Sequence, residues 1–312
     1  MIKSYKALRK EIGGMSLVVS ELTKRFGEKT AVDRLGFEMV SPGVFGLIGT
    51  NGAGKTTTIR MILGIMRPDA GSSEWNGRKI NRDSLSFGYM PEERGIYGKV
   101  KVIEQLVYFG MLRKMSKADA LASALRWTDR LGIAEYRQMN ADKLSKGNQQ
   151  KVQLAATLIH DPQLIILDEP FSGLDPVNTE LLRQVIGELI GAEKYIVMSS
   201  HQMTTVEEYC ENIILLHRGK TVLEGNLREI KAGYGHTRLL VDASEDTADI
   251  AAACGLTLRE KRADGTEYAV SGKAQADAFL AALTAAGVFP THYELREPSL
   301  NEIFIEKTES GV

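Results

Sequence analysis

The stretch that decides the fold is GTNGAGKT, residues 49–56, which matches the pattern GxxxxGK[ST]. A short apolar run at 44–48 precedes it, as in a buried strand, and a helical stretch that stops before Pro68 follows it. Glycines let backbone N–H groups turn inward around phosphate oxygens, and the N-terminus of the helix directs its positive dipole end at the same anion. The stretch therefore predicts a phosphate-binding loop between a strand and a helix.

The side chains of this loop predict contacts with a nucleotide and a metal ion. Lys55 supplies a point charge to the β- and γ-phosphates of a nucleotide, and the hydroxyl of Thr56 can ligate Mg²⁺. The loop residues expected to contact the nucleotide are Asn51, Gly52, Ala53, Gly54, Lys55 and Thr56.

Two carboxylates and a histidine end two later apolar runs. Asp168 and Glu169 follow the buried-strand pattern LIIL at 164–167, and His201 ends the run VMSSH. The carboxyl ends of strands in an open α/β sheet face the ligand crevice, so these side chains are expected near the phosphates. Asp168 can hold Mg²⁺ through a water, Glu169 can polarise the water that attacks the γ-phosphate, and a ring nitrogen of His201 can bond that phosphate or orient the water.

The pattern along the chain predicts two folded parts. Up to about residue 230, apolar strands alternate with helices, which favours an α/β fold with a mainly parallel sheet covered on both faces. From about 103 to 136, the apolar residues follow helical spacing and predict a helical insert. The glycines of AGYG, 232–235, indicate a linker. We expect an N-terminal extension at 1–14, the α/β part at 15–231 and a second part at 236–312.

The second part reads as strand, helix, hairpin, helix and strand, an order that suggests a small α+β ferredoxin-like sandwich. Its hairpin is expected to turn at the Asp-Gly pair, 264–265, because this pair is a strong turn signal. Ser299 and Glu302 have capping-box spacing, so a last helix is expected to start there.

Composition argues against several classes of function. Lys and Arg number 39 against 40 Asp and Glu, a net charge of −1, so no nucleic-acid partner is expected at a strongly basic surface. No run of about 18 consecutive apolar residues is present, so no segment is expected to span a bilayer. The two cysteines, Cys210 and Cys254, lie in no metal-ligand spacing and fit a reducing cytosol.

The stretch LSKGNQQ at 144–150 provides a family resemblance. It resembles the signature, usually LSGGQ, of the nucleotide-binding subunits of ABC (ATP-binding cassette) transporters, and the resemblance covers about residues 16–230. Ser145 and Gly147 open a helix here, and a helix N-terminus that begins with serine is an anion site. Because the chain already has its own phosphate-binding loop, this second site implies the ATP of a partner. The resemblance implies a head-to-tail dimer with two ATP molecules between the subunits.

The resemblance also assigns roles to single residues. Phe26 is similar to the aromatic residue that stacks on adenine, with Val32 beside it. Thr57 is similar to the residue that contacts the α-phosphate, and the stretch SGLD at 172–175 to the loop that crosses the dimer interface. The signature residues expected to bind nucleotide are Ser145, Gly147 and Asn148.

Two positions depart from the family pattern. Glu92 stands where the family usually has a glutamine that ligates Mg²⁺ and senses the γ-phosphate. A carboxylate can still ligate Mg²⁺, but it repels phosphate oxygens unless the metal screens it. Lys146 replaces the middle glycine of the signature and adds a positive charge beside the anion site.

The resemblance implies a P-loop ABC cassette that hydrolyses ATP with Mg²⁺ to power a transporter. The expected partners are a separate transmembrane permease, which the helical insert at about 93–140 would contact, and a second, identical ABC subunit. Such a chain would lie at the cytoplasmic face of the cell membrane. The stretches PEERGIYGKV, LSKGNQQK and PSLNEIFIE resemble a bacterial subgroup of exporters that carry a small C-terminal domain.

Two alternatives stay open at the level of the sequence. A non-transport ABC protein, such as a ribosome-associated factor or a DNA-repair ATPase, usually carries two cassettes or a long coiled coil, and this chain shows neither pattern. The second part is either a ligand-sensing domain or a wedge that stabilises the dimer. Its sequence has no metal cluster, phosphate loop or aromatic box, which favours the wedge.

Overall fold

The computed structural model describes residues 15–80, 87–93 and 95–309. Contacts divide the chain into two compact units, and the division falls between Glu224 and Gly225. The extension expected at 1–14 lies outside the described residues. The finer domain limits, 15–231 and 236–312, stay predictions.

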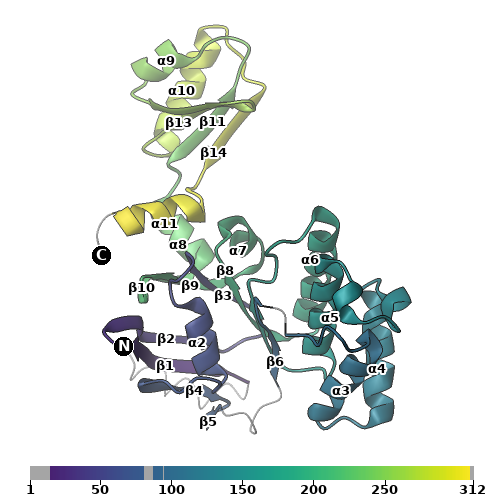
Figure 1. Cartoon of the computed structure of the whole chain (residues 1–312). Coiled ribbons are helices and arrows are strands. Elements are labelled where there is room, and N and C mark those ends of the chain that lie inside the picture. The colour runs from purple at the N-terminus through teal and green to yellow at the C-terminus, as the bar shows by residue number, and fades with distance from the viewer. Residues whose placement is uncertain (1–14, 81–86, 94, 310–312) are drawn as a thin grey trace. The chain divides into compact units, whose positions relative to one another are not determined.

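A six-stranded sheet forms the centre of the first unit, in the order β10-β9-β3-β8-β7-β6 (Figure 1). Strands β3, β6, β7, β8 and β9 run parallel where they pair. The strands are β3 (Gly43–Gly49), β6 (Phe87–Met90), β7 (Leu164–Asp168), β8 (Tyr195–Ser200), β9 (Asn212–His217) and β10 (Lys220–Asn226). Every residue of β7 and β8 is buried, as expected of strands that are covered on both faces. The α/β fold with a mainly parallel sheet is therefore confirmed.

A second, antiparallel sheet packs with helix α2 (Lys55–Ile62) over one face of the parallel sheet. Its order is β2-β1-β4-β5, and its side chains share one core cluster with α2 and with alternate residues of β3, β7, β8 and β9. Its strands are β1 (Leu17–Phe26), β2 (Lys29–Met39), β4 (Ala70–Trp75) and β5 (Arg78–Lys79). Because strand side chains alternate between faces, Ile165 and Leu167 of β7 are buried on the opposite side. The loop that precedes α2 is thereby held between two packed layers.

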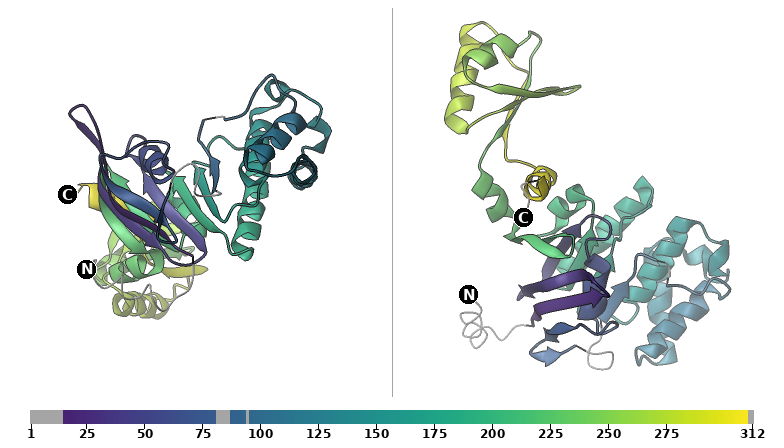
Figure 2. Two further views of the ribbon diagram at one scale, coloured as in Figure 1. Left: turned by 90° about the horizontal axis from the view of Figure 1, so that it is seen from below. Right: turned by 60° about the vertical axis from the view of Figure 1, so that its left-hand side comes forward.

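The helical insert is confirmed. It lies beside β6, at the end of the parallel sheet away from β1 and β2 (Figures 1 and 2). Its elements are α3 (Val102–Leu112), α4 (Lys117–Arg130), the short 3₁₀ helices η1 (Ala134–Tyr136) and η2 (Ala141–Lys143), and α5 (Lys146–Leu158). Two further helices, α6 (Pro176–Gly191) and α7 (Met203–Tyr209), follow β7 and β8. In the described ranges, no helix is both long enough and apolar enough to span a bilayer.

The second unit contains the expected strand-helix-strand-strand-helix-strand order. Its antiparallel sheet runs β12-β13-β11-β14 and packs against two helices over an apolar core around Tyr268 and Phe279. Its elements are α8 (Leu227–Tyr234), β11 (Arg238–Asp242), α9 (Ala248–Ala253), β12 (Thr257–Arg262), β13 (Gly265–Ala269), α10 (Lys273–Ala285), β14 (His292–Arg296) and α11 (Leu300–Glu309). The small α+β unit predicted from the sequence is present.

Three local expectations in this unit can be compared with the structure. The capping box is confirmed, because Ser299 N–H donates to Glu302 Oε2 at 2.9 Å and Glu302 N–H donates to Ser299 Oγ at 3.3 Å. The hairpin is also present, but Arg262 pairs with Gly265, so its turn lies one residue earlier than expected. The prediction of a linker at 232–235 is wrong, because helix α8 continues to Tyr234 and ends only at Gly235, which has a φ of 68°.

Candidate active site

The loop at 49–56 joins the end of β3 to the start of α2, as the sequence predicts. Gly49 and Gly54 have φ of 157° and 112°, in the region that favours glycine. A Cβ at Gly49 would lie 2.5 Å from the carbonyl oxygen of Leu216, and a Cβ at Gly54 would lie 2.5 Å from that of Ala31. The backbone of β9 and β2 therefore leaves room only for glycine at these two positions. Their close packing fixes the course of the loop and leaves Asn51 and Gly52 exposed.

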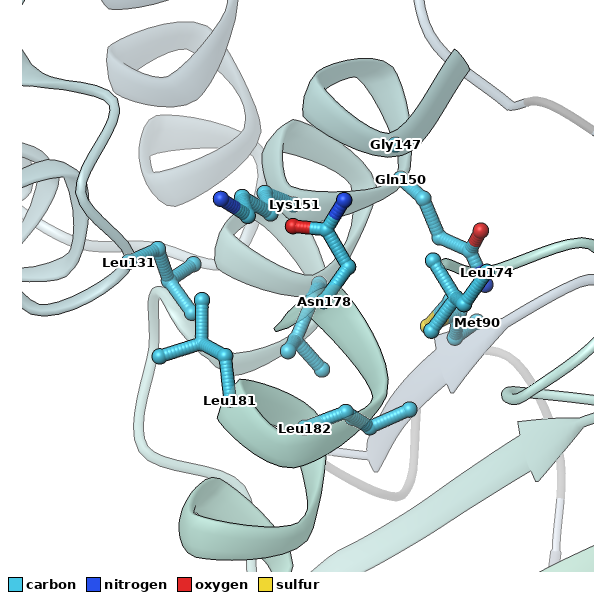
Figure 3. A pocket seen from close by; sticks show the side chains of 10 residues that line it. Met90, Leu131, Gly147, Gln150, Lys151, Leu174, Asn178, Leu181 and Leu182 are labelled. Atoms are coloured by element: carbon cyan, nitrogen blue, oxygen red, sulfur yellow. The ribbon is translucent and has the colours of Figure 1, made fainter. Parts of the chain in front are cut away.

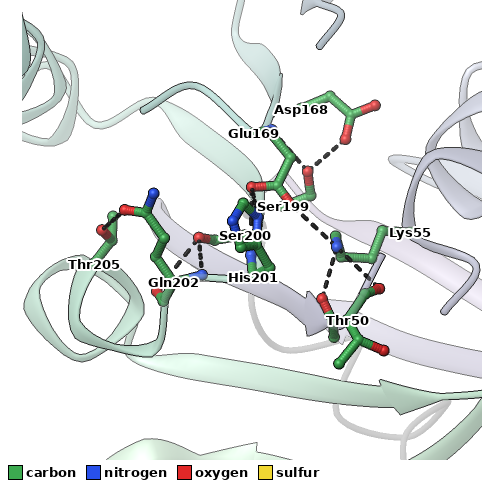
Figure 4. Close-up of polar contacts among 10 residues, drawn as sticks. Thr50, Lys55, Asp168, Glu169, Ser199, Ser200, His201, Gln202 and Thr205 are labelled. Carbon is green, nitrogen blue, oxygen red and sulfur yellow. Dashed lines mark hydrogen bonds and ion pairs between the residues drawn. The ribbon is translucent and has the colours of Figure 1, made fainter. Parts of the chain in front are cut away.

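Lys55, Glu169 and His201 come together from three different elements (Figure 4). Lys55 Nζ donates to the carbonyl oxygen of Gly49 at 2.7 Å and lies 3.0 Å from Glu169 Oε1. The other carboxylate oxygen, Oε2, lies 2.8 Å from His201 Nδ1 and accepts the His201 backbone N–H at 3.3 Å. The Lys55 and Glu169 side chains are 6% and 4% exposed, whereas that of His201 is 40% exposed. The arrangement places a cation, a carboxylate and an accessible imidazole in one chain of contacts.

Asp168 lies beside this group and is held by a serine that sequence reasoning missed. Ser199 Oγ donates to Asp168 Oδ1 at 2.5 Å and accepts the Glu169 N–H at 2.9 Å. Burial raises the pKa of Asp168, while hydrogen bonds from the Ser199 and Thr56 hydroxyls act in the opposite direction. The second oxygen, Oδ2, is buried without a hydrogen-bond partner among the described residues. The sequence does contain a signal for Ser199, because this hydroxyl residue directly follows the apolar run YIVM at 195–198 and so continues a buried strand.

The backbone at Glu169 is strained. Its φ is 51°, in the left-handed region that costs a residue with a Cβ about 1–2 kcal/mol. The hydrogen bond from its N–H to Ser199 Oγ holds this conformation. Strained residues of this kind are concentrated at functional sites, where surrounding contacts maintain them. The turn aims the side chain back toward Lys55 and His201 instead of along the strand (Figure 4).

The signature residues form a separate group at the N-terminus of α5. Ser145 is the N-cap residue and its hydroxyl accepts the Asn148 N–H at 3.3 Å. Ser145 and Lys146 are exposed, while Gly147 faces the Asn178 side chain so closely that a Cβ there would collide with it. Asp175 caps α6 by accepting the Asn178 N–H at 2.9 Å. The stretch 172–175 thus ends next to the signature turn of the same chain.

Four other residues expected at the site lie as follows. Phe26 is 50% exposed at the end of β1, with Lys24 Nζ 5.7 Å from its ring centroid. Val32 is fully buried and packs against Gly54, so it supports the phosphate-binding loop from beneath. Thr57 is half-buried in the first turn of α2, and Glu92 is exposed just after β6.

A phosphate-binding loop at the end of β3, with two buried carboxylates at the end of β7, which β8 separates from β3 in the parallel sheet, defines the class of P-loop ATPases. The family comparison agrees, since residues 32–172 match the family described as "ABC transporter" and residues 225–308 match "ATP-binding protein DrrA1-3-like, C-terminal domain". The chain belongs to the family of ABC transporter ATP-binding proteins.

Individual relatives cover most of the chain. The ABC transporter ATP-binding protein YhaQ of Bacillus subtilis (strain 168) is 43% identical over 93% of this chain and 98% of its own length. The Nod factor export ATP-binding protein I of Paraburkholderia xenovorans (strain LB400) is 34% identical over 66% of this chain and 69% of its own. A solved structure of an ATP-binding subunit of an ABC transporter aligns with a TM-score of 0.64 at 29% identity, covering 70% of this chain and 92% of that one.

Membership of this family confirms the resemblance drawn from the signature. The chain is an ATP-binding and ATP-hydrolysing subunit that works with a transmembrane component. The roles of the individual site residues stay predictions, because the family assignment does not test them.

Proposed function

We propose that this chain hydrolyses ATP between two head-to-tail copies of itself to drive an exporter at the cytoplasmic face of the membrane. The observation that carries the proposal is the contact chain from Lys55 through Glu169 to His201 at the end of the phosphate-binding loop. A buried carboxylate between a lysine and an accessible imidazole suits the activation of water beside a phosphate.

The position of Lys55, Glu169 and His201 suggests a role for each of them in hydrolysis. Lys55 starts α2 at the end of the loop, so its ammonium group would neutralise phosphate oxygens held by the loop N–H groups. Glu169 would accept a proton from the attacking water, and the exposed face of His201 would orient that water or the γ-phosphate. Phe26, exposed on β1, would stack on the base.

Mg²⁺ fits the oxygen atoms that the site offers. Asp168 Oδ2 is buried without a hydrogen-bond partner in the described part of the chain. The Thr56 hydroxyl lies close enough to Asp168 to oppose the rise that burial causes in the pKa of this carboxyl group. Hydroxyl and carboxylate oxygens are preferred Mg²⁺ ligands, and few protein ligands are needed where phosphates supply the others. The ion would supply charge neutralisation on the phosphates. Glu92 is the proposed additional ligand. Burial, assisted by the charge of Asp168 and to a smaller extent by that of Glu92, raises the pKa of Tyr89 to about 12.

The dimer is supported by the second anion site. Ser145 caps α5 and, like Lys146, is exposed, so the N-terminus of this helix is available to phosphate oxygens of another subunit. The exposed residues Ser172 and Gly173 precede the half-buried Leu174 and the Asp175 cap of α6, and this stretch would lie in the same interface. A head-to-tail dimer would bring the phosphate-binding loop of one subunit against the Ser145 end of α5 of the other, and one chain carries both of these surfaces.

The helical insert would dock the permease. Aromatic and aliphatic side chains gather on its surface: Tyr97 stacks on Phe109 at 5.8 Å between ring centroids, and Tyr108, Met111 and Leu112 are about half exposed. Exposed apolar clusters of this kind mark protein interfaces. Export as the direction of transport is supported by the relative that is named for Nod factor export.

The central test is Glu169→Gln. The amide cannot take a proton from water, so hydrolysis should fall at least about a hundredfold while ATP binding persists. With ATP and Mg²⁺ the variant should elute as a dimer from a sizing column and return to monomer without ATP. Glu180→Gln, an exposed carboxylate on α6, is the matched control and should hydrolyse ATP normally. Normal turnover by Glu169→Gln would remove Glu169 from its role.

The permease partner is tested separately. The chain purified from native membranes should bring an integral membrane protein with it. Its consistent absence would contradict the transport part of the proposal and leave the ATPase part standing.

A further inference from the structure

Two glutamines of α5 reach across to the catalytic core. The Gln150 amide Nε2 donates to the carbonyl oxygen of Pro170 at 2.6 Å. The Gln153 Nε2 donates to the carbonyl oxygens of Pro91 at 2.6 Å and Glu93 at 3.3 Å. These bonds join one face of a single helix to two separate loops of the parallel sheet.

The residues that accept these bonds flank the two carboxylates on which the proposed chemistry depends. Pro170 directly follows Glu169, whose strained φ of 51° must be maintained by its surroundings. Pro91 and Glu93 enclose Glu92 on both sides. Neither loop has regular secondary structure, so a hydrogen bond to its backbone carbonyl fixes its position more than it would within a strand.

The apolar packing between α5 and α6 leaves a gap beside Gln150. A small apolar cavity of about 20 Å³ lies between the two helices (Figure 3). Gln150 lines it together with Leu154 of α5 and Leu181 and Leu182 of α6. Atoms that border this gap lose dispersion contacts on one side, so the hydrogen bond from Gln150 to Pro170 adds a directional contact where the packing is less dense.

We propose that Gln150 and Gln153 are positioning residues through which α5 sets the catalytic loops of its own chain. The inference rests on the proposed dimer, in which the Ser145 end of α5 binds the ATP of the partner. Engagement of that ATP fixes α5, Gln150 then holds Pro170 and with it Glu169, and Gln153 holds the loop of Glu92. Each subunit would thus become competent to hydrolyse its own ATP only after its signature helix has bound the other nucleotide.

The first test is Gln150→Met, which keeps the length of the side chain and removes the donor. The loss of one partly buried positioning hydrogen bond should lower kcat about tenfold and leave the KM for ATP nearly unchanged, because the phosphate-binding loop is untouched. Thr157→Val is the matched control: Thr157 Oγ1 also bonds α5 to the core, at the carbonyl oxygen of Tyr89, but contacts neither catalytic loop. Both variants should melt at similar temperatures. A kcat for Gln150→Met within twofold of the control overturns the assignment.

A double-mutant cycle with Ser145→Ala distinguishes positioning from local stability. If the effect of Ser145 on hydrolysis passes through Gln150, the double variant should lose much less kcat than the product of the two single losses. Losses that multiply would show that the two residues act independently, and would overturn the transmission. Thr157→Val combined with Ser145→Ala should give multiplied losses.

Gln153→Met tests the second connection through a different observable. Release of the Glu92 loop should raise the Mg²⁺ concentration for half-maximal hydrolysis about threefold, whereas Gln150→Met should leave that concentration unchanged. An unchanged Mg²⁺ requirement in Gln153→Met removes Gln153 from the proposal. Failure of the dimer itself is seen independently, because Glu169→Gln would then stay monomeric with ATP.

Discussion

At the scale of single residues, a cluster of buried ionisable side chains distinguishes the candidate site from the rest of the first unit. Counted as whole residues, Lys55, Asp168 and Glu169 are 6%, 1% and 5% exposed, and they lie at one edge of the sheet. Ionised groups are costly to bury unless other groups compensate them, so three at one place require a reason beyond stability. Lys194, by contrast, is buried at 5% exposure but pairs outward with the exposed Asp161 at 2.8 Å. That pair is an ordinary structural ion pair, and the cluster at the loop is not.

Ser199→Ala should impair catalysis by releasing two groups at once. The hydroxyl donates to Asp168 and accepts the N–H of Glu169, so its removal leaves Asp168 with burial as the dominant influence and a still higher pKa. We expect kcat to fall about tenfold and the Mg²⁺ requirement to rise at pH 7. Because a raised carboxyl pKa leaves more of the group protonated, part of the loss should be recovered as the pH is raised.

Ser200→Ala is the matched control for this prediction. It removes the neighbouring hydroxyl, which accepts the Gln202 N–H at 2.9 Å in the following turn and contacts neither carboxylate. Steady-state ATPase assays across Mg²⁺ concentration and pH compare the two variants. Equal kinetics for Ser199→Ala and Ser200→Ala would contradict the role given to Ser199.

The sequence predicts the residues of the site that belong to motifs and misses those that act through them. Lys55, Asp168 and Glu169 follow from the phosphate-binding pattern and the strand that ends in two carboxylates. The motifs assign no role to Ser199 or Gln150, although Gln150 lies within the signature stretch, because the function of both depends on which backbone or carboxylate group the fold brings within hydrogen-bond distance. The environment of Val32 is likewise set by the fold: its type and position fit a contact with the base, which stays a prediction, and only the packing around Gly54 shows that the residue is buried.

At the scale of elements, continuous apolar runs predict the central strands correctly. These strands are buried on both faces, so apolar and polar residues do not alternate along them. The helix end at 232–235 is harder. Gly233 has no atom within 4 Å of where a Cβ would lie, so this glycine is a tolerated helical residue and not a break. The Asn226 side chain accepts the N–H groups of Arg228 and Glu229 and starts α8, a cap that the glycines nearby conceal.

His160, at the junction of α5 and β6, should make folding stability depend on pH. Burial, assisted by the nearby Arg113 guanidinium, lowers the pKa of this imidazole from 6.5 to about 4. Its Nε2 lies 3.1 Å from the Phe87 carbonyl oxygen, which suits a neutral ring that donates there. As the pH falls from 6.5 to 4, the unfolded chain binds a proton that the folded chain does not, so stability decreases across this window.

His160→Gln keeps an amide donor for Phe87 and removes the titrating group. Thermal melting curves between pH 7 and pH 4 should therefore show a shallower loss of Tm for the variant than for the wild type, with the two differing least at low pH. Other carboxylates titrate in both proteins, so the difference between the two curves is the informative quantity. Parallel curves would show that His160 does not contribute.

At the scale of the whole molecule, each unit has a core of its own. The core of the first unit lies between its two sheets and includes Trp75, and that of the second is built around Tyr268 and Phe279. Both tryptophans of the sequence, Trp75 and Trp127, belong to the first unit. Tryptophan fluorescence therefore reports the first unit, while far-UV circular dichroism reports both.

The second unit depends on a buried arginine, and this gives a prediction for its stability. Arg238 of β11 is 7% exposed and lies 3.1 Å from Glu267 of β13 and 2.5 Å from Glu302 of α11. Arg238→Met removes the positive charge between these carboxylates, and breaking a buried pair in this way costs about 3 kcal/mol. Circular dichroism should show an earlier transition for the second unit during denaturant unfolding.

Lys273→Met separates this effect from a general loss of charge. Lys273 forms an exposed pair with Asp277 on α10, and surface pairs of this kind contribute about 0.5 kcal/mol or less. The fluorescence midpoint should change little in either variant, because neither residue lies in the unit that contains the tryptophans. If the fluorescence transition of Arg238→Met moved as far as its dichroism transition, the two cores would not unfold as separate units. If the second unit is a wedge that stabilises the dimer, Arg238→Met introduced into Glu169→Gln should also shorten the lifetime of the ATP-bound dimer on a sizing column.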